Sequence, residues 1–92
     1  MKTLKLFATL RDIAGKKEMA VPFQDGDTVR TLLKGVEVQC PELAHEILDD
    51  KGELTGLVHI LVHGRHIHWG DGLDTVIRES DRVVLMPPTA GG

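Results

Sequence analysis

The sequence predicts an α+β domain in which a mixed sheet of four or five strands packs on one main helix. Three observations support this prediction. Residues 2–9 alternate apolar and polar side chains, which is the period of a half-buried strand. Residues 29–36 carry apolar side chains at helical spacing, and residues 82–86 are apolar on both faces, as is typical of a central strand. The order of these elements places the last strand in the middle of the sheet, beside and parallel to the first.

The N-terminal segment is predicted to contain two paired strands separated by a short helical turn. In the strand at residues 2–9, alternation places two sets of side chains on opposite faces: Leu4, Leu6 and Ala8 on one, and Thr3, Lys5 and Phe7 on the other. Residues 10–15 form one helical turn or a loop that ends at Gly15. Residues 18–23 are a second short strand and a plausible hairpin partner of the first.

The main helix is predicted to begin after Asp27 or Thr28, because either side chain can accept a hydrogen bond from the unpaired amides of a helix start. Gly35 weakens this helix by about 1 kcal/mol relative to alanine. Pro41 breaks the helix and suits the first position of a second, shorter one. The predicted buried residues of the two helices are Val29, Leu32, Leu33 and Val36, then Leu43, Ala44, Ile47 and Leu48.

The second half of the chain is predicted to contain a hairpin and the central strand. Residues 57–62 and 65–69 are the hairpin strands, with His63-Gly64 as the tight turn between them. Residues 73–77 form a helical turn, and residues 82–86 form the last strand.

A small apolar patch is predicted on the sheet face that points away from the helix. If the first and last strands are neighbours, Phe7, Val84 and Met86 lie together on that face. Exposed apolar patches often mark partner surfaces, so we expect these residues to contact a partner. Arg11 is close in sequence to Phe7 and either pairs with a partner carboxylate or remains solvated.

Size, charge and composition exclude several function classes. The chain has 92 residues, a formal net charge of −3 and only three aromatic residues. It therefore lacks the basic face and stacking platforms that nucleic-acid binding requires. No apolar run approaches the roughly 18 residues of a membrane span, so we expect a cytoplasmic protein without membrane association. No catalytic triad, phosphate loop or paired-carboxylate site can be argued from the sequence.

The histidines are candidate metal ligands, and the single cysteine is a candidate reactive thiol. Four histidines lie on or beside the second hairpin: His59, His63, His66 and His68. If His63-Gly64 is the turn centre, His59 and His68 face each other, and imidazoles placed in this way can bind Zn²⁺. The hairpin gives at most two convergent ligands, so we expect no native metal site. Cys40 has no disulfide partner in the chain and is expected to be a quiet, partly buried thiol.

The last residues differ in composition from the rest of the chain, and we divide it into a domain at residues 1–86 and a flexible tail at residues 87–92. Pro87 and Pro88 cannot extend a central strand, and they favour an extended path off the sheet. Gly91 and Gly92 lack a Cβ, so a partner can thread them through a narrow slot. A carboxylate on Gly92 needs activation, such as adenylation by ATP, before it accepts sulfur or an amine. The tail geometry leaves both outcomes open.

Several segments, taken in order, carry a resemblance to a known family: Lys5-Leu6-Phe7-Ala8-Thr9-Leu10-Arg11-Asp12, Thr28-Val29 with Leu32-Leu33, Pro41-Glu42-Leu43, Val62-His63-Gly64-Arg65, Asp74-Thr75 with Ser80-Asp81-Arg82-Val83, and Met86-Pro87-Pro88-Thr89-Ala90-Gly91-Gly92. They are spread over nearly the whole chain, and the Pro-Pro-x-Ala-Gly-Gly ending is the most specific. Together they resemble the small subunit of molybdopterin synthase and its ubiquitin-like sulfur-carrier relatives. The sequence departs from that pattern at His63, Ser80 and Thr89, where the family often has Asn, Gly and Val.

The resemblance implies a ubiquitin-like β-grasp fold and a role as a sulfur carrier for molybdenum or tungsten cofactor synthesis. It implies that a ubiquitin-activating-type enzyme adenylates Gly92 with ATP and that a desulfurase or rhodanese-like donor supplies sulfur for a thiocarboxylate. The tail, which comprises Pro87, Pro88, Thr89, Ala90, Gly91 and Gly92, then enters the large subunit of the synthase. The protein is on this view a recharged co-substrate with no bound cofactor, not an enzyme.

Three alternatives to this role stay open. The first is a ubiquitin-like modifier that is joined to lysines. The second is a sulfur carrier for another acceptor, as in tRNA thiolation or thiamine synthesis. The third alternative is a non-covalent binding module whose tail has no function.

Overall fold

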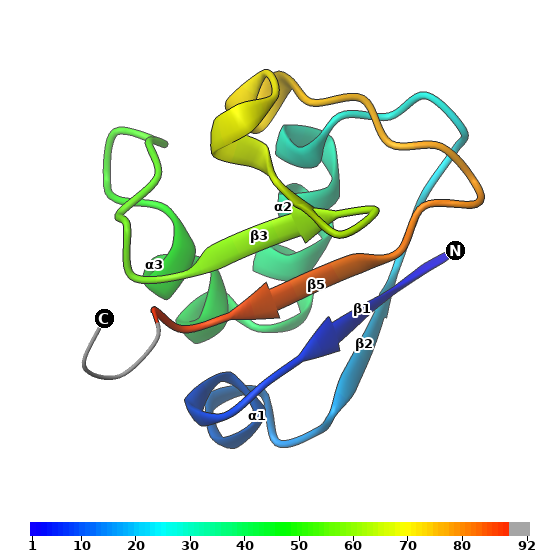
Figure 1. Cartoon of the computed structure of the whole chain (residues 1–92). Coiled ribbons are helices and arrows are strands. Elements are labelled where there is room, and N and C mark those ends of the chain that lie inside the picture. The colour runs from blue at the N-terminus through cyan, green and yellow to red at the C-terminus, as the bar shows by residue number, and fades with distance from the viewer. Residues whose placement is uncertain (89–92) are drawn as a thin grey trace.

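The computed structural model describes residues 1–88 and contains a five-stranded mixed sheet in the order β2-β1-β5-β3-β4. Helices α2 and α3 lie behind one face of the sheet, and the described residues leave the other face open (Figure 1). The predicted α+β class is therefore confirmed. None of the helices in residues 1–88 is long and apolar enough to cross a lipid bilayer. The elements are β1 (Lys2–Leu6), α1 (Thr9–Ala14), β2 (Glu18–Val21), α2 (Val29–Gln39), α3 (Pro41–Ile47), β3 (His59–Val62), β4 (Arg65–His66), the 3₁₀ turns η1 (Ile67–Trp69) and η2 (Gly72–Asp74), and β5 (Val83–Met86).

The two central strands, β1 and β5, run parallel to each other, as the sequence predicts. Leu4 is paired with Val83 and Leu6 with Leu85 across the two strands. Leu4, Leu6 and Leu85 have no exposed surface, so this pairing forms the centre of the hydrophobic core. β5 also pairs antiparallel with β3, and β1 with β2. Because parallel neighbours need a long crossover, the two helices fit between these strands in the sequence.

The main helix α2 begins where the sequence predicts and presses closely on the sheet. Thr28 is its N-cap, and the Thr28 side chain accepts from the Thr31 amide at 3.3 Å. A Cβ on Gly35 would lie 3.1 Å from the Val21 Cβ and 3.2 Å from the Pro22 Cδ. This glycine therefore permits the close approach of α2 to the end of β2. The predicted buried residues of α2 and α3 are confirmed except Leu48, which is half-buried after the end of α3.

Several strand boundaries differ from the prediction. β1 ends at Leu6, so Ala8 does not share the buried face of that strand. Ala8 is exposed and has a φ of 52°, because the chain turns there to begin α1. β2 ends at Val21, since Pro22 has no N–H to donate to a strand. The remaining differences are the start of β3 at His59 and the replacement of the helical turn at residues 73–77 by η2.

The second hairpin has the predicted turn but a shorter second strand. His63 and Gly64 have φ angles of 55° and 78°, and Val62 is paired with Arg65, as in a two-residue hairpin turn. β4 ends at His66 instead of residue 69 and is followed by η1. A continuous strand would place Ile67 and Trp69 on the same face. The turn of η1 instead buries Ile67 and leaves Trp69 69% exposed.

Lys2 is a buried cation that ties the start of β1 to the loop that precedes β5. Its Nζ donates to the backbone oxygens of Arg78 (3.0 Å), Glu79 (2.8 Å) and Asp81 (2.8 Å). The same atom lies 4.6 Å from the centre of the Phe23 ring. Only 7% of Lys2 is exposed, and its three N–H donors each have an acceptor, which offsets the burial of the charge.

Replacement of Lys2 by methionine should lower the free energy of unfolding by about 2–4 kcal/mol, because three carbonyl oxygens lose a charged donor. Lys5→Met is the matched control, since Lys5 lies on the same strand but is exposed. We expect the control to change stability by no more than about 0.5 kcal/mol. Urea denaturation of both variants measures the difference. Equal losses in the two variants would contradict the anchoring role of Lys2.

Candidate functional site on the open face of the sheet

Outward-facing side chains of β1, β5 and β3 lie side by side on the open face of the sheet. Val84 is paired with Lys5 of β1 and with Leu61 of β3. Met86 is paired with His59 of β3. These residues alternate along β5 and β3 with the buried ones, so their side chains point away from the helices.

Phe7 completes a hydrophobic group on this face. Its N–H donates to the Leu85 oxygen at 3.1 Å, which holds Phe7 beside β5. Phe7, Val84 and Met86 thus share the face that the sequence predicts. Leu61 was missed, although residues 60–62 are apolar on both faces, as β5 is. We call Phe7, Leu61, Val84 and Met86 the apolar patch, and each of its members is half-buried.

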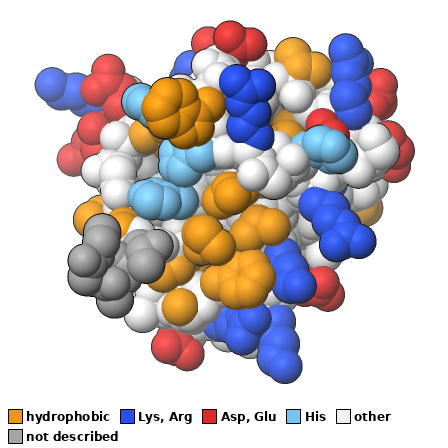
Figure 2. Space-filling view, in the orientation of Figure 1, with side chains coloured by type: hydrophobic (Ala, Val, Ile, Leu, Met, Phe, Trp, Pro, Cys, Tyr) orange, Lys and Arg blue, Asp and Glu red, His pale blue; other side chains and the backbone are white. Residues whose placement is uncertain are grey.

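Charged side chains border the apolar patch. Figure 2 shows hydrophobic side chains gathered on this face, with a group of histidines on one side and several Lys and Arg side chains on the other. The Lys5 Nζ and the Arg11 guanidinium carbon lie 5.4 Å and 5.2 Å from the centre of the Phe7 ring, within cation–π distance. A groove of about 470 Å³ crosses this border between Phe7 and Val84. Its charged lining residues are Lys5, Glu18, Asp81 and Arg82.

Arg11 has a structural use in addition to its place at the edge of the patch. Its Nε donates to the Leu6 oxygen at 2.8 Å, at the point where β1 ends. That bond and the Phe7 contact hold the guanidinium group over the start of α1. Arg11 is half-buried. Its contact with a partner stays a prediction.

The apolar patch lies near the edge at which the chain leaves the sheet. Because β1 and β5 are parallel, their carboxyl ends reach the same edge, where α1 also lies (Figure 1). β5 ends at Met86, and Pro87 and Pro88 follow without regular secondary structure. A partner that covers the patch therefore also meets the start of the predicted tail. The predicted roles of Thr89, Ala90, Gly91 and Gly92 lie outside the described residues.

The histidines of the second hairpin border the patch on its other side. The ring centres of His59 and His66 are 4.8 Å apart in an edge-to-face arrangement. The prediction that His59 faces His68 is wrong, because β4 ends at His66 and η1 carries His68 away from the strand pair. In residues 1–88, no three side chains of His, Cys, Asp or Glu are placed to hold a metal ion. Cys40 is half-buried, with its Sγ 3.9 Å from the Ile13 oxygen.

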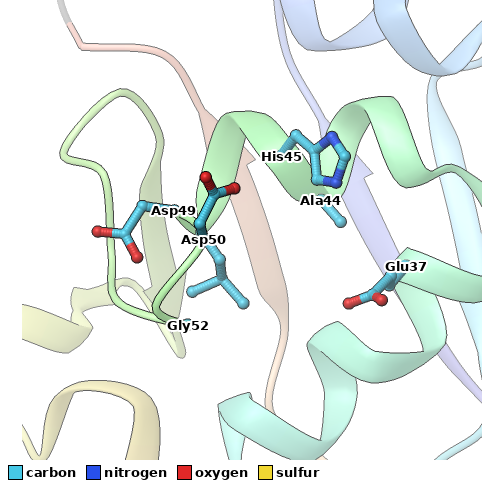
Figure 3. A pocket seen from close by; sticks show the side chains of 7 residues that line it. Glu37, Ala44, His45, Asp49, Asp50 and Gly52 are labelled. Atoms are coloured by element: carbon cyan, nitrogen blue, oxygen red, sulfur yellow. The ribbon is translucent and has the colours of Figure 1, made fainter.

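An acidic hollow lies on the helical side of the molecule. It has a volume of about 280 Å³ between α2, α3 and the loop after α3, and its polar side chains are Glu37, His45, Asp49 and Asp50 (Figure 3). The carboxylates in Figure 3 point in different directions rather than toward one point. Asp49 Oδ1 accepts from the amides of Lys51 and Glu53 at 2.8 and 3.0 Å, which stabilises the loop. These carboxylates offer a cation no shared set of ligands.

Comparison with known proteins identifies the family. The ThiS family model matches residues 4–92. The chain belongs to the ThiS family. Small archaeal modifier protein 3 of Haloferax volcanii is 35% identical over 89 residues, which are 97% of this chain and 96% of the relative. The sulfur carrier protein CysO of Mycobacterium tuberculosis is 29% identical over 69 residues, which are 73% of this chain and 74% of CysO.

The fold is shared with solved structures of this kind. The crystal structure of small archaeal modifier protein 1 from Haloferax volcanii superposes with a TM-score of 0.82 at 28% identity, over 99% of this chain and 98% of that one. The ubiquitin-like β-grasp fold that the sequence resemblance implies is therefore confirmed. As a ThiS-family member, the chain belongs to the ubiquitin-like sulfur carriers and their modifier relatives.

Replacement of Arg11 by alanine should lower the free energy of unfolding by about 1–2 kcal/mol, because the Leu6 oxygen loses a charged donor and Phe7 loses its packing partner. Arg82→Ala is the matched control, since Arg82 is exposed at the same edge of the groove. Its stability should change by no more than about 0.5 kcal/mol. Urea denaturation at low and high salt measures both. If Arg11→Ala is as stable as the control, the Leu6 bond contributes nothing.

Proposed function

We propose that this chain is a sulfur carrier whose Gly92 carboxyl group becomes a thiocarboxylate and donates its sulfur in molybdopterin biosynthesis. The observation that carries the proposal is the apolar patch beside the strand end from which Pro87 and Pro88 continue toward Gly92. In this arrangement one partner can hold the open face while the following residues reach its active site. The sulfur-carrier relative and the segments that resemble the small subunit of molybdopterin synthase support this choice.

The proposed chemistry takes place in three steps at Gly92. In the activating enzyme, a carboxylate oxygen attacks the α-phosphorus of ATP, so that an acyl adenylate forms and pyrophosphate leaves. A persulfide sulfur of the donor then attacks the acyl carbon; a C–S bond forms, the C–O bond to AMP breaks, and AMP leaves. A thiol then attacks the donor's sulfur in the resulting acyl disulfide, so that the S–S bond breaks, the thiocarboxylate leaves, and the donor and the thiol are joined in a new disulfide. Activation is needed because an ionised carboxylate resists nucleophiles. The thiocarboxylate is consumed when its sulfur passes to the pterin precursor.

In this scheme the chain is a co-substrate rather than an enzyme, and its partners supply the catalytic groups. We infer three partners: a ubiquitin-activating-type enzyme that uses ATP, a desulfurase or rhodanese-like sulfur donor, and the large subunit of molybdopterin synthase. The four residues of the apolar patch are Phe, Leu, Val and Met, none of which is a nucleophile or a general base. The patch is therefore suited to docking.

A second candidate function is that of a protein modifier joined to lysine side chains. It is favoured by the 35% identity to a protein named small archaeal modifier protein 3. An amine would then displace AMP from the same acyl adenylate, and an amide bond would form. Transfer of the sulfur to another acceptor, in tRNA thiolation or thiamine synthesis, differs from the first candidate only in the partner that takes it.

Incubation with ATP, a sulfur donor and the activating enzyme of the same cell should replace one oxygen of the C-terminal carboxyl group by sulfur. Intact-mass measurement, with the change mapped to the C-terminal peptide, tests this. A variant that lacks Gly92 and a reaction without ATP are the controls, and both should keep their starting mass. An unchanged mass beside an active enzyme control would overturn the carrier role. Amide-linked products on lysines would move the assignment to the modifier.

Val84→Asp should weaken binding to the activating enzyme by about 10- to 100-fold, because a carboxylate in the centre of the apolar patch must be desolvated on docking. Val38→Asp is the matched control: Val38 is 85% exposed and lies on α2, on the other side of the sheet. Titration calorimetry with both variants measures the two affinities, and circular dichroism verifies their folding. Equal affinities would place the docking surface elsewhere on the molecule.

A further inference from the structure

His66 forms an unusual cap at the start of η1. It is the last residue of β4, and its side-chain Nδ1 accepts a hydrogen bond from the His68 amide at 2.9 Å. An imidazole nitrogen can accept only when it carries no proton, so in neutral His66 the proton is on Nε2. Protonation of Nδ1 would place its N–H opposite the N–H of His68, and two donors cannot form a hydrogen bond. The cap therefore exists only while His66 is neutral.

The groups around His66 all disfavour its charged form. His59 of β3 lies 4.8 Å from His66 and His68 of η1 lies 6.2 Å from it, measured between ring centres. The cavity of about 370 Å³ that these three imidazoles share is otherwise lined by uncharged residues of segment 54–58 and by Gly72 of η2. Arg65 of β4 is the nearest cation in sequence, and no carboxylate lines this cavity among the described residues. Burial, then His59 and His68, lower the pKa of His66 from its ordinary value of 6.5.

The cap lies at the edge of the open face. η1 carries His68 and Trp69, whose rings are 5.2 Å apart, and its other end is held by Arg65, whose Nη2 donates to the Trp69 oxygen at 2.7 Å. Loss of the His66 bond would free the start of η1, while the Gly70 amide, which donates to the Ile67 oxygen at 3.0 Å, and the buried Ile67 side chain still hold the rest of the turn. His66 is also paired with Leu61 of the apolar patch, so the capped turn is continuous with the patch.

We propose that His66 is a proton-operated cap that fixes the start of η1 at neutral pH and loosens it on acidification, beside the exposed Trp69. The direction of the pH effect on the cap follows from proton binding. The uncapped turn binds the proton more readily than the capped turn, so the cap is favoured above the ordinary histidine pKa and is lost as the pH falls below it. The proposal concerns the free protein and is independent of sulfur transfer.

The test follows the His68 amide and the His66 ring of the full chain by NMR between about pH 5 and about pH 8. We expect the amide resonance to move with the same midpoint as the His66 ring, below the ordinary histidine value. In His66→Asn the amide should not titrate, because the Asn oxygen caps a helical turn without binding protons in this range. His45→Asn is the control, since His45 is exposed on α3. In this variant the His68 amide resonance should move with pH as it does in the parent protein.

Any one of three results would overturn the proposal. The first is that the His68 amide resonance does not shift with pH in the unmodified protein. The second is that the midpoint of the amide shift differs from that of the His66 ring, and the third is that the amide in His66→Asn still titrates with the parent midpoint. The third result would assign the transition to His59 or His68. Because the first two comparisons need no variant, they remain decisive if His66→Asn fails to fold.

Discussion

The parallel pairing of β1 with β5 is the constraint on which the rest of the structure depends. It brings the first and last strands of the described chain together, so the core closes only after nearly all residues are available. It also fixes direction: both carboxyl ends reach one edge, where Phe7 packs beside the end of β5 and Pro87 continues the chain. At the opposite end, Lys2 holds the loop that feeds β5. The place at which the chain leaves the sheet is therefore determined by buried contacts, not by the tail.

A small sheet with helices on one side leaves its other side to solvent. β5 is central, so its outward residues Val84 and Met86 are flanked by neighbouring strands and remain only half-buried. Polar residues there would serve a free protein equally well, whereas apolar ones favour a partner that removes them from water. Because the sheet is rigid, a partner on this face receives the following residues from a fixed origin. In the proposed function, docking and presentation of the reactive group would therefore depend on the same strand.

Patterns within one element were sufficient to predict much of this architecture. Burial can be predicted from the spacing of apolar residues. Three such patterns are the alternation in β1, the apolar stripe of α2 and the apolar residues on both faces of β5. Contacts between distant elements were missed. Helix propensity predicts that Gly35 weakens α2, but the close approach of α2 to Val21 requires a residue without a Cβ at this position. Lys2 gave no signal, because its acceptors lie more than 75 residues away in the sequence. At the early end of β4 the His66 side chain accepts a hydrogen bond from the backbone, and such a bond competes with strand pairing. A bond of this kind does not change the spacing of apolar residues, so the sequence pattern does not predict it.

The activated carboxyl group of Gly92 would be the same species in every function that the family resemblance leaves open. Sulfur transfer to a pterin, transfer to another acceptor and amide formation with a lysine all begin from one acyl adenylate. The reactive end therefore cannot select among them, and selection has to come from the surface that partners bind. The docking surface that we propose joins an apolar centre to Lys5 and Arg82 on one side and to His59 and His66 on the other. A partner that selects one of these functions therefore has to match both borders of the apolar centre.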